Sequence, residues 1–120
     1  MSEPTTLTVR GEFDVIVART RVRDLARESG LNTTDQACIS LATSSTARAL
    51  GLGKAHTGQI LIEGIASEER TGVRVICTAM NGGNSGQPRS MDEARTMTDD
   101  LEIEVSPENE TRVTLVKWAK

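Results

Sequence analysis

The beginning of the chain passes from an alternating pattern to a helical one. Residues 6–10 alternate between polar and apolar side chains up to Gly11, as a half-buried edge strand does. From Asp14 the apolar positions recur at helical spacing, and Gly30 supplies a stop. These positions are Val15, Ala18, Val22, Leu25 and Ala26. The spacing predicts an amphipathic helix from Asp14 to about Gly30.

Residues 32–36, Asn-Thr-Thr-Asp-Gln, predict the start of a second helix that runs to about Leu50. Thr33 can cap the free backbone amides, and Gln36 is placed to complete a capping box. One face of this helix is unusually small and half polar. It comprises Cys38, Leu41, Ala42, Ser45 and Ala49. Either another backbone approaches this face closely, or the face lines a pocket.

The rest of the chain predicts two hairpins and a short helix. The predicted strands are residues 59–66 paired with 73–79, and 101–105 paired with 113–117. Residues 81–88 are a loop, and Ser90 caps a short helix that ends near Met97. This order predicts an α+β fold over residues 1–120, a two-layer α/β sandwich with helices on one face of a mixed, mostly antiparallel sheet.

Composition limits the classes of partner. A chain of 120 residues suits one domain. Aromatic residues make up 2% and Tyr is absent, so the sequence offers no stacking platform for single-stranded nucleic acid. The net charge of −3 also argues against binding to phosphate backbones or anionic lipid. We therefore expect no nucleic-acid partner and no membrane partner.

Acidic residues concentrate late in the chain. Between Asp92 and Glu110 they outnumber the basic residues, of which Arg95 is the only one. They are Asp92, Glu93, Asp99, Asp100, Glu102, Glu104, Glu108 and Glu110. Such a run is typical of a solvated face, and the alternative is a docking surface for a basic protein.

The cysteines and the chain start favour the cytoplasm. Cys38 and Cys77 lie in separate apolar stretches, which suits buried thiols in a reducing compartment. No apolar run approaches the ~20 residues of a membrane span. Residues 1–5 have neither the basic start nor the apolar stretch of a signal peptide. His56 is the single histidine, so a zinc site or a His-based triad lacks its other members.

Four segments resemble one family in order along nearly the whole chain. They are Phe-Asp-Val-Ile-Val-Ala-Arg at 13–19, Asp-Gln-Ala-Cys-Ile at 35–39, Thr-Ala-Arg at 46–48 and Val-Thr-Leu-Val-Lys-Trp at 113–118. Together they resemble the anti-sigma factor and switch-kinase branch of the GHKL, or histidine-kinase-like, ATPases, especially the RsbT-like serine kinases. The resemblance implies the two-layer sandwich described above.

The resemblance also implies catalytic positions that this sequence does not fill. Active members carry a Glu that assists proton transfer and, four residues later, an Asn that ligates magnesium. The corresponding residues here are Ser45 and Ala49. Serine has no carboxylate, and alanine has no oxygen for a hard cation. We therefore expect no catalytic residue and no metal at these positions.

The adenine and phosphate motifs are degenerate by the same comparison. The family Asp that binds the adenine amino group corresponds to Ala79, and the two family glycines correspond to Asn81 and Gly83. No Gly follows between Gly86 and Leu101, so the phosphate loop is missing. We expect a pseudo-ATPase without a nucleotide cofactor, whose vacated pocket is filled by methionines. They are Met80, Met91 and Met97.

The first predicted helix carries a series of arginines that is either a solvated face or a partner surface. They are Arg19, Arg21, Arg23 and Arg27. In the family, the Arg that follows Ala in this helix contacts the partner protein, which implies partner contacts at Arg19 and, beside it, Arg23. The implied partners are an STAS-domain antagonist, a sigma factor or a paralogous kinase. A homodimer, an active serine kinase with atypical motifs, and a structural assembly subunit remain alternatives.

Overall fold

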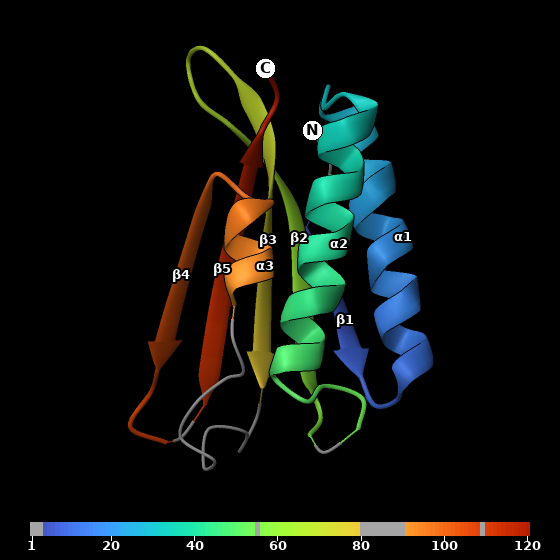
Figure 1. Cartoon of the computed structure of the whole chain (residues 1–120), viewed down its shortest axis with the longest axis vertical. Helices are drawn as coiled ribbons and strands as arrows, with labels where there is room; N and C mark the ends of the chain where they lie inside the picture. Colours follow the sequence, from blue (N-terminus) through green and yellow to red (C-terminus); the bar gives the residue numbers. More distant parts are fainter. Residues whose placement is uncertain (1–3, 55, 80–90, 109) are drawn as a thin grey trace.

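The computed structural model describes residues 4–54, 56–79, 91–108 and 110–120. Five strands and three helices are assigned in this part of the chain (Figure 1). They are β1 (Thr5–Val9), α1 (Glu12–Glu28), α2 (Thr33–Ala49), β2 (Gly58–Ala66), β3 (Thr71–Ala79), α3 (Asp92–Thr96), β4 (Asp100–Val105) and β5 (Thr111–Trp118). The predicted order of elements is confirmed. The predicted loop at 81–88 lies outside the described residues.

The five strands form one sheet in the order β1-β2-β3-β5-β4. Both predicted hairpins are present, with Leu61 opposite Ile76 in the first and Ile103 opposite Val113 in the second. The helices cover one face of this sheet, so the predicted α+β two-layer sandwich is confirmed (Figure 1). All the pairings among the described strands are antiparallel, so the parallel component of a mixed sheet is not observed there.

Helix α1 begins two residues before the predicted start. The carboxylate of Asp14 accepts hydrogen bonds from the backbone amides of Arg10 (2.9 Å) and Gly11 (3.3 Å). Asp14 therefore caps the first turn from a position inside the helix. Its negative charge there also interacts favourably with the helix dipole. Gly30, with φ of 92°, follows the helix as predicted.

The cap of α2 is Asn32, not Thr33. The Asn32 side chain accepts a hydrogen bond of 2.8 Å from the backbone amide of Asp35. Gln36 does not complete a capping box with Thr33, because its side-chain amide donates to the carbonyl of Leu31 at 2.9 Å. The helix nevertheless begins where the sequence predicts.

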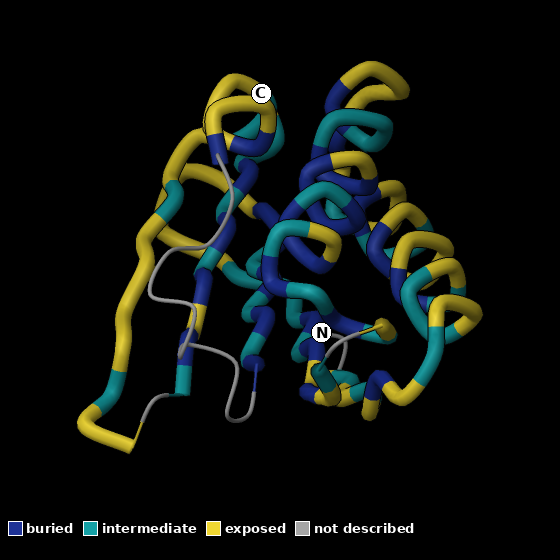
Figure 2. Tube along the Cα trace, turned by 60° about the horizontal axis from the view of Figure 1, so that its bottom comes forward, coloured by how far each residue is buried: buried dark blue, intermediate teal, exposed yellow. Residues whose placement is uncertain are grey.

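The core is aliphatic and lies between the helix layer and the sheet (Figure 2). The buried side of α2 differs from the prediction. Its buried residues are Asp35, Ile39, Ser40, Ala42, Thr43, Ser44, Thr46 and Ala47. Leu41 is 46% exposed, and Cys38, Ser45 and Ala49 are only partly buried. The expected close approach of a backbone occurs on the neighbouring side, where the Ser40 hydroxyl donates to the Arg19 carbonyl at 3.4 Å.

Helix α3 packs beside α2 on the same face of the sheet (Figure 1). Ala94 is fully buried and Met91 nearly so. Met91 occupies the N-cap position and makes no side-chain capping bond, while Ser90, the predicted cap, lies outside the described residues. The described helices include none that is long and apolar enough to cross a membrane.

An ion cluster joins three elements at the end of the molecule where β5 finishes. The ammonium group of Lys117 on β5 lies 3.7 Å from a carboxylate oxygen of Asp35 on α2 and 3.7 Å from one of Asp99, just before β4. Asp99 also accepts a hydrogen bond from the backbone amide of Trp118. The guanidinium of Arg70, from the β2–β3 turn, lies 4.2 Å from the centre of the Trp118 ring.

Candidate functional site

The positions that the resemblance assigns to catalysis and adenine binding come from two elements. Ser45 and Ala49 share one side of α2 in its second half, and Ala79 is the last residue of β3. Both elements finish at the same end of the molecule (Figure 1). Ala79 is fully buried and lies between Gly58 of β2 and Thr111 of β5 in the sheet.

The side chains at these positions do not fit a nucleotide with magnesium. Ser45 offers a hydroxyl, and Ala49 and Ala79 offer only methyl groups. In the described part of the chain, no group of three or more His, Cys, Asp or Glu side chains could hold a metal ion. Asn81, Gly83 and Gly86 lie outside the described residues, so the phosphate-loop prediction stays a prediction.

Apolar residues from the α3 region pack against the core beside α2. Met91 and Ala94 belong to the buried core, and Met97 packs against it from a partly buried position. That methionines fill the nucleotide space of the family stays a prediction, and Met80 lies outside the described residues. Asp92 and Glu93 are exposed in the first turn of α3, as expected of acids that stabilise a helix start.

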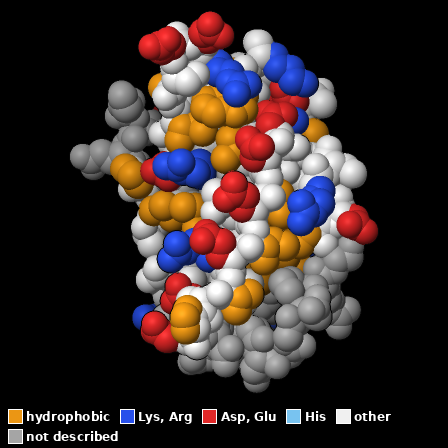
Figure 3. All heavy atoms as spheres, turned by 90° about the vertical axis from the view of Figure 1, so that its left-hand side faces the viewer, with side chains coloured by type: hydrophobic (Ala, Val, Ile, Leu, Met, Phe, Trp, Pro, Cys, Tyr) orange, Lys and Arg blue, Asp and Glu red, His pale blue; other side chains and the backbone are white. Residues whose placement is uncertain are grey.

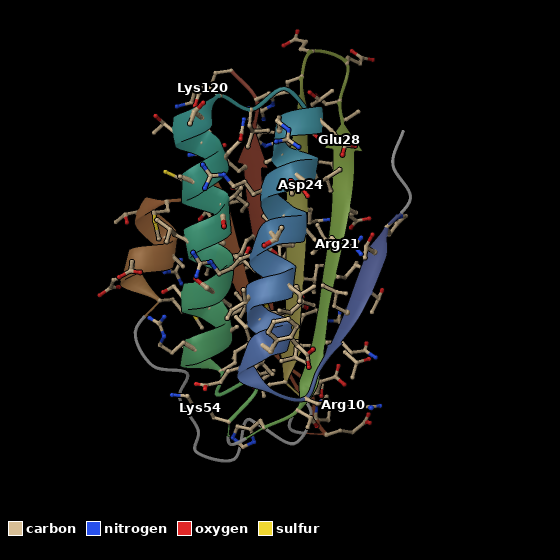
Figure 4. The ribbon with its side chains drawn as sticks, turned by 90° about the vertical axis from the view of Figure 1, so that its right-hand side faces the viewer. Arg10, Arg21, Asp24, Glu28, Lys54 and Lys120 are labelled. Carbon is tan, nitrogen blue, oxygen red and sulfur yellow. The ribbon has the colours of Figure 1, made fainter. Side chains whose placement is uncertain are left out.

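The arginines of α1 do not form one stripe. Arg21 lines a hollow between α1 and the β1–β2 edge together with Asp24 and Glu28, on the side of α1 away from α2 (Figure 4). Arg27 pairs with Asp24 at 3.4 Å. Arg19 and Arg23, four residues apart, remain exposed, and their guanidinium groups make no ion pair or hydrogen bond with other described residues.

A groove between α1 and α2 is the feature that the sequence patterns do not reveal. It has a volume of about 310 Å³ and takes residues from both helices and from the turn after α2. The lining comprises Glu12, Val15, Ile16, Arg19, Ser44, Arg48, Gly51, Leu52 and Lys54. Arg19 is the one predicted partner-binding residue in this set. Arg48, Leu52 and Lys54 were missed, because only the packing of α2 on α1 brings them beside Arg19.

The turn after α2 is held tightly against the start of α1. Gly53 has φ of 85°, and a Cβ at this position would lie 2.9 Å from the backbone carbon of Gly11. The backbone amide of Gly53 donates to the His56 carbonyl at 2.9 Å. Leu52 is buried beneath this turn, and Lys54 pairs with Glu12 at 3.1 Å. The end of the groove is therefore fixed in place.

The acidic segment lies along the β4 edge of the sheet. Figure 3 shows acidic side chains following one another down this edge with apolar side chains on both sides. Acids of this segment have partners within the chain, among them Asp99, which pairs with Lys117, and Glu110, which pairs with Arg112. Glu102 and Glu104 are exposed on β4. The segment is therefore partly structural and partly a solvated edge.

The two cysteines occupy different environments. Both are free thiols. Complete burial raises the pKa of Cys77 to about 12, because the apolar surroundings disfavour the thiolate. Cys38 is partly exposed. A buried, protonated Cys77 fits the structural role expected from the sequence.

Comparison with known proteins gives one curated relative and one solved structure of note. No protein-family model matches the chain. The serine/threonine-protein kinase RsbT of Bacillus subtilis (strain 168) is 35% identical over 83 residues, which are 69% of this chain. The matched region spans 62% of the length of that kinase.

The solved structure is similar in fold. The crystal structure of the RsbU and RsbW domains of Rv1364c from Mycobacterium tuberculosis superposes with a TM-score of 0.69 at 17% identity. The superposition covers 97% of this chain and 32% of that chain. The identity to RsbT confirms the sequence resemblance to the RsbT-like kinases, and the superposition confirms the RsbW-like GHKL fold.

Proposed function

We propose that the chain, a relative of the kinase RsbT with the RsbW-like GHKL fold, is a regulator that works by binding a protein partner. It does so without transferring phosphate. Its setting is a bacterial partner-switching or anti-sigma pathway in the cytoplasm. The partner is an STAS-domain antagonist, a sigma factor or a paralogous kinase.

The lack of phosphoryl transfer is supported by the chemistry of three positions. Phosphoryl transfer needs a group that positions or deprotonates the nucleophile and oxygen ligands for Mg²⁺. Ser45 and Ala49 provide neither a carboxylate nor an amide on that side of α2. Ala79, fully buried in the hydrophobic core, provides no acceptor for an adenine amino group. The burial of Ala79 is the observation that most strongly supports a site without nucleotide.

The protein-binding role is supported by Arg19 and Arg23. Both are exposed on α1, and their guanidinium groups are unpaired within the described residues. Arginine is enriched at interface anchors because its planar fork binds carboxylates through two hydrogen bonds. The alternative function is an active serine kinase with atypical motifs. It is favoured by the 35% identity to RsbT, whose name states that activity.

The decisive experiment is affinity capture from the native host with three versions of the chain. Parent protein and Arg21→Glu are expected to retain the same partner, because Arg21 lies on the side of α1 away from α2. Arg19→Glu is expected to lose it. The two variants carry the same change of charge on the same helix. If all three versions capture the same proteins equally, the α1 surface is not the interface and the proposal is wrong.

A further inference from the structure

The groove between α1 and α2 combines an apolar floor with a charged rim. Val15 and Leu52 provide buried or partly buried apolar surface inside it, and Ile16 stands at its α1 edge, 54% exposed. Ser44 and Arg48 line the α2 side at one helical turn's spacing. Small residues at the helix contact, such as Ser40 and Ser44, keep the two helices close above the floor.

Apolar surface continues outside the groove on both helices. Phe13, the only Phe in the chain, is 71% exposed one turn before Ile16 on α1. Leu41 is 46% exposed one turn before Ser44 on α2. A small ligand held in about 310 Å³ would leave both side chains in water. A protein surface laid along the groove would cover them, which is the usual reason for an exposed apolar patch with a polar rim.

The charge of the groove selects the partner's chemistry. Lys54 is paired with Glu12 at 3.1 Å, whereas the guanidinium groups of Arg19 and Arg48 have no carboxylate partner among the described residues. Of the other acids of α1, Asp14 accepts hydrogen bonds from the backbone amides of Arg10 and Gly11. Asp24 and Glu28 lie on the side of the helix away from α2 (Figure 4). The groove therefore has an excess of positive charge next to an apolar floor. A carboxylate is the group that complements it.

We propose that this groove docks an acidic segment of a partner protein. One branched or aromatic side chain of the segment enters between Val15, Ile16 and Leu52, and a neighbouring carboxylate lies between Arg19 and Arg48. The inference rests on the proposed protein-binding function, and it adds the chemistry of the partner and a second helix to the interface.

A nuclear magnetic resonance titration of the full ¹⁵N-labelled chain tests the groove without a known partner. The probe is a blocked peptide that copies residues 100–105, Asp-Leu-Glu-Ile-Glu-Val, because it alternates acidic and branched apolar side chains. One control peptide replaces each acid by Lys, and the other replaces each apolar residue by Ser. The first peptide is expected to shift the amide resonances of residues within 12–19 and 44–54. Each control peptide is expected to bind with an affinity at least about tenfold lower.

Matched variants separate the groove from general charge effects. Arg48→Glu and Ile16→Ser are expected to weaken binding of the acidic peptide about tenfold, because each removes one half of the recognition. Both residues are exposed, so the fold is retained, which circular dichroism checks. Arg21→Glu, with the same charge change as Arg48→Glu, is expected to bind like the parent.

The possible results distinguish the groove from the proposed function. Equal shifts with the Lys peptide, or unchanged affinity in Arg48→Glu, overturn the groove. Shifts of the same amides on adding unlabelled chain, with dimers in sedimentation, would make a second copy the occupant and also overturn it. Peptide binding as expected, combined with host capture that Arg19→Glu leaves unchanged, would show that the groove binds acidic segments but does not hold the host partner; this result contradicts the proposed function and the groove's role in it. Host capture that Arg19→Glu abolishes, combined with no binding of the acidic peptide, would support the proposed function and overturn the groove.

Discussion

A substitution at Ala79 tests whether the space at the end of β3 is packed with side chains or is accessible to water. An Asp at the end of β3 would place a carboxylate where the alanine methyl is fully buried in the hydrophobic core. Burying an unpaired carboxylate costs roughly 3 kcal/mol or more. We expect Ala79→Asp to lower the free energy of unfolding by about that amount in urea denaturation.

The control for Ala79 is Ala66, which ends β2 in an exposed position. Ala66→Asp is expected to change stability by less than about 0.5 kcal/mol. If Ala79→Asp unfolds at the same urea concentration as the parent, water reaches the end of β3 and the space near α3 is open to a ligand.

Cys77 offers a second test at the same scale. Its thiol, with a pKa of about 12, stays protonated as the pH rises from about 7 to 10, whereas an ordinary cysteine passes its pKa of ~8.5 in that range. A thiol reagent added to the folded chain is expected to label Cys38 alone and Cys77 only after denaturation. Rapid labelling of both thiols at pH 8 would contradict the burial of Cys77.

At the scale of elements, the Lys117 cluster holds the start of α2, the end of β5 and the entry to β4 together. The Lys117 and Asp35 side chains are 9% and 7% exposed, and one oxygen of Asp35 is buried without a hydrogen bond. Lys117→Met leaves Asp35 as an unpaired buried charge, so we expect a loss of about 3 kcal/mol in thermal or urea unfolding.

A double-variant cycle identifies the source of that loss. Asp35→Asn combined with Lys117→Met removes the charge as well as its partner, and we expect part of the stability to return. Asp99→Asn is expected to lower the free energy of unfolding by less than Lys117→Met or Asp35→Asn does, because the Asp99 side chain is 35% exposed. Additive losses in the double variant would show that the two groups do not interact.

The elements also show where sequence patterns suffice. The hairpins β2–β3 and β4–β5 were predictable because their strands are rich in β-branched and aliphatic residues and are bounded by polar turns. The buried side of α2 was not, because Ser, Thr and Ala dominate the helix and its hydrophobic periodicity is weak. The cap was misplaced by one residue because Asn32 and Thr33 are both good caps.

The site divides in the same way. The assignment of Ser45, Ala49 and Ala79 to the catalytic and adenine positions of the family comes from aligning local segments, and it stays a prediction. Arg48 and Lys54 lie beside Arg19 only because α2 and the following turn pack on α1. This contact joins segments that are distant in sequence, so local patterns do not reveal it. Arg21 was grouped with the wrong set because helical rotation places it on the opposite side from Arg19.

At the scale of the whole molecule, the proposed function predicts that the chain does not bind ATP. A site occupied at 100 times its dissociation constant adds ~2.7 kcal/mol of stability, which raises the melting temperature by about 10 °C in a domain of this size. We expect no shift with millimolar Mg²⁺ and ATP, measured by differential scanning fluorimetry. A saturable shift would favour the alternative of an active kinase.

Trp118 gives this molecule a built-in optical probe. It is the only Trp, Tyr is absent, and the indole lies under the Arg70 guanidinium beside the Lys117 cluster. The α1–α2 groove, with Lys54, lies toward the other end of the molecule (Figure 4). Intrinsic fluorescence therefore reports on the region where β5, the β2–β3 turn and the entry to β4 meet. A partner that contacts only the groove does not touch Trp118 and is not expected to change its fluorescence directly. A quench on partner binding would be the signature of motion transmitted along the length of the sheet.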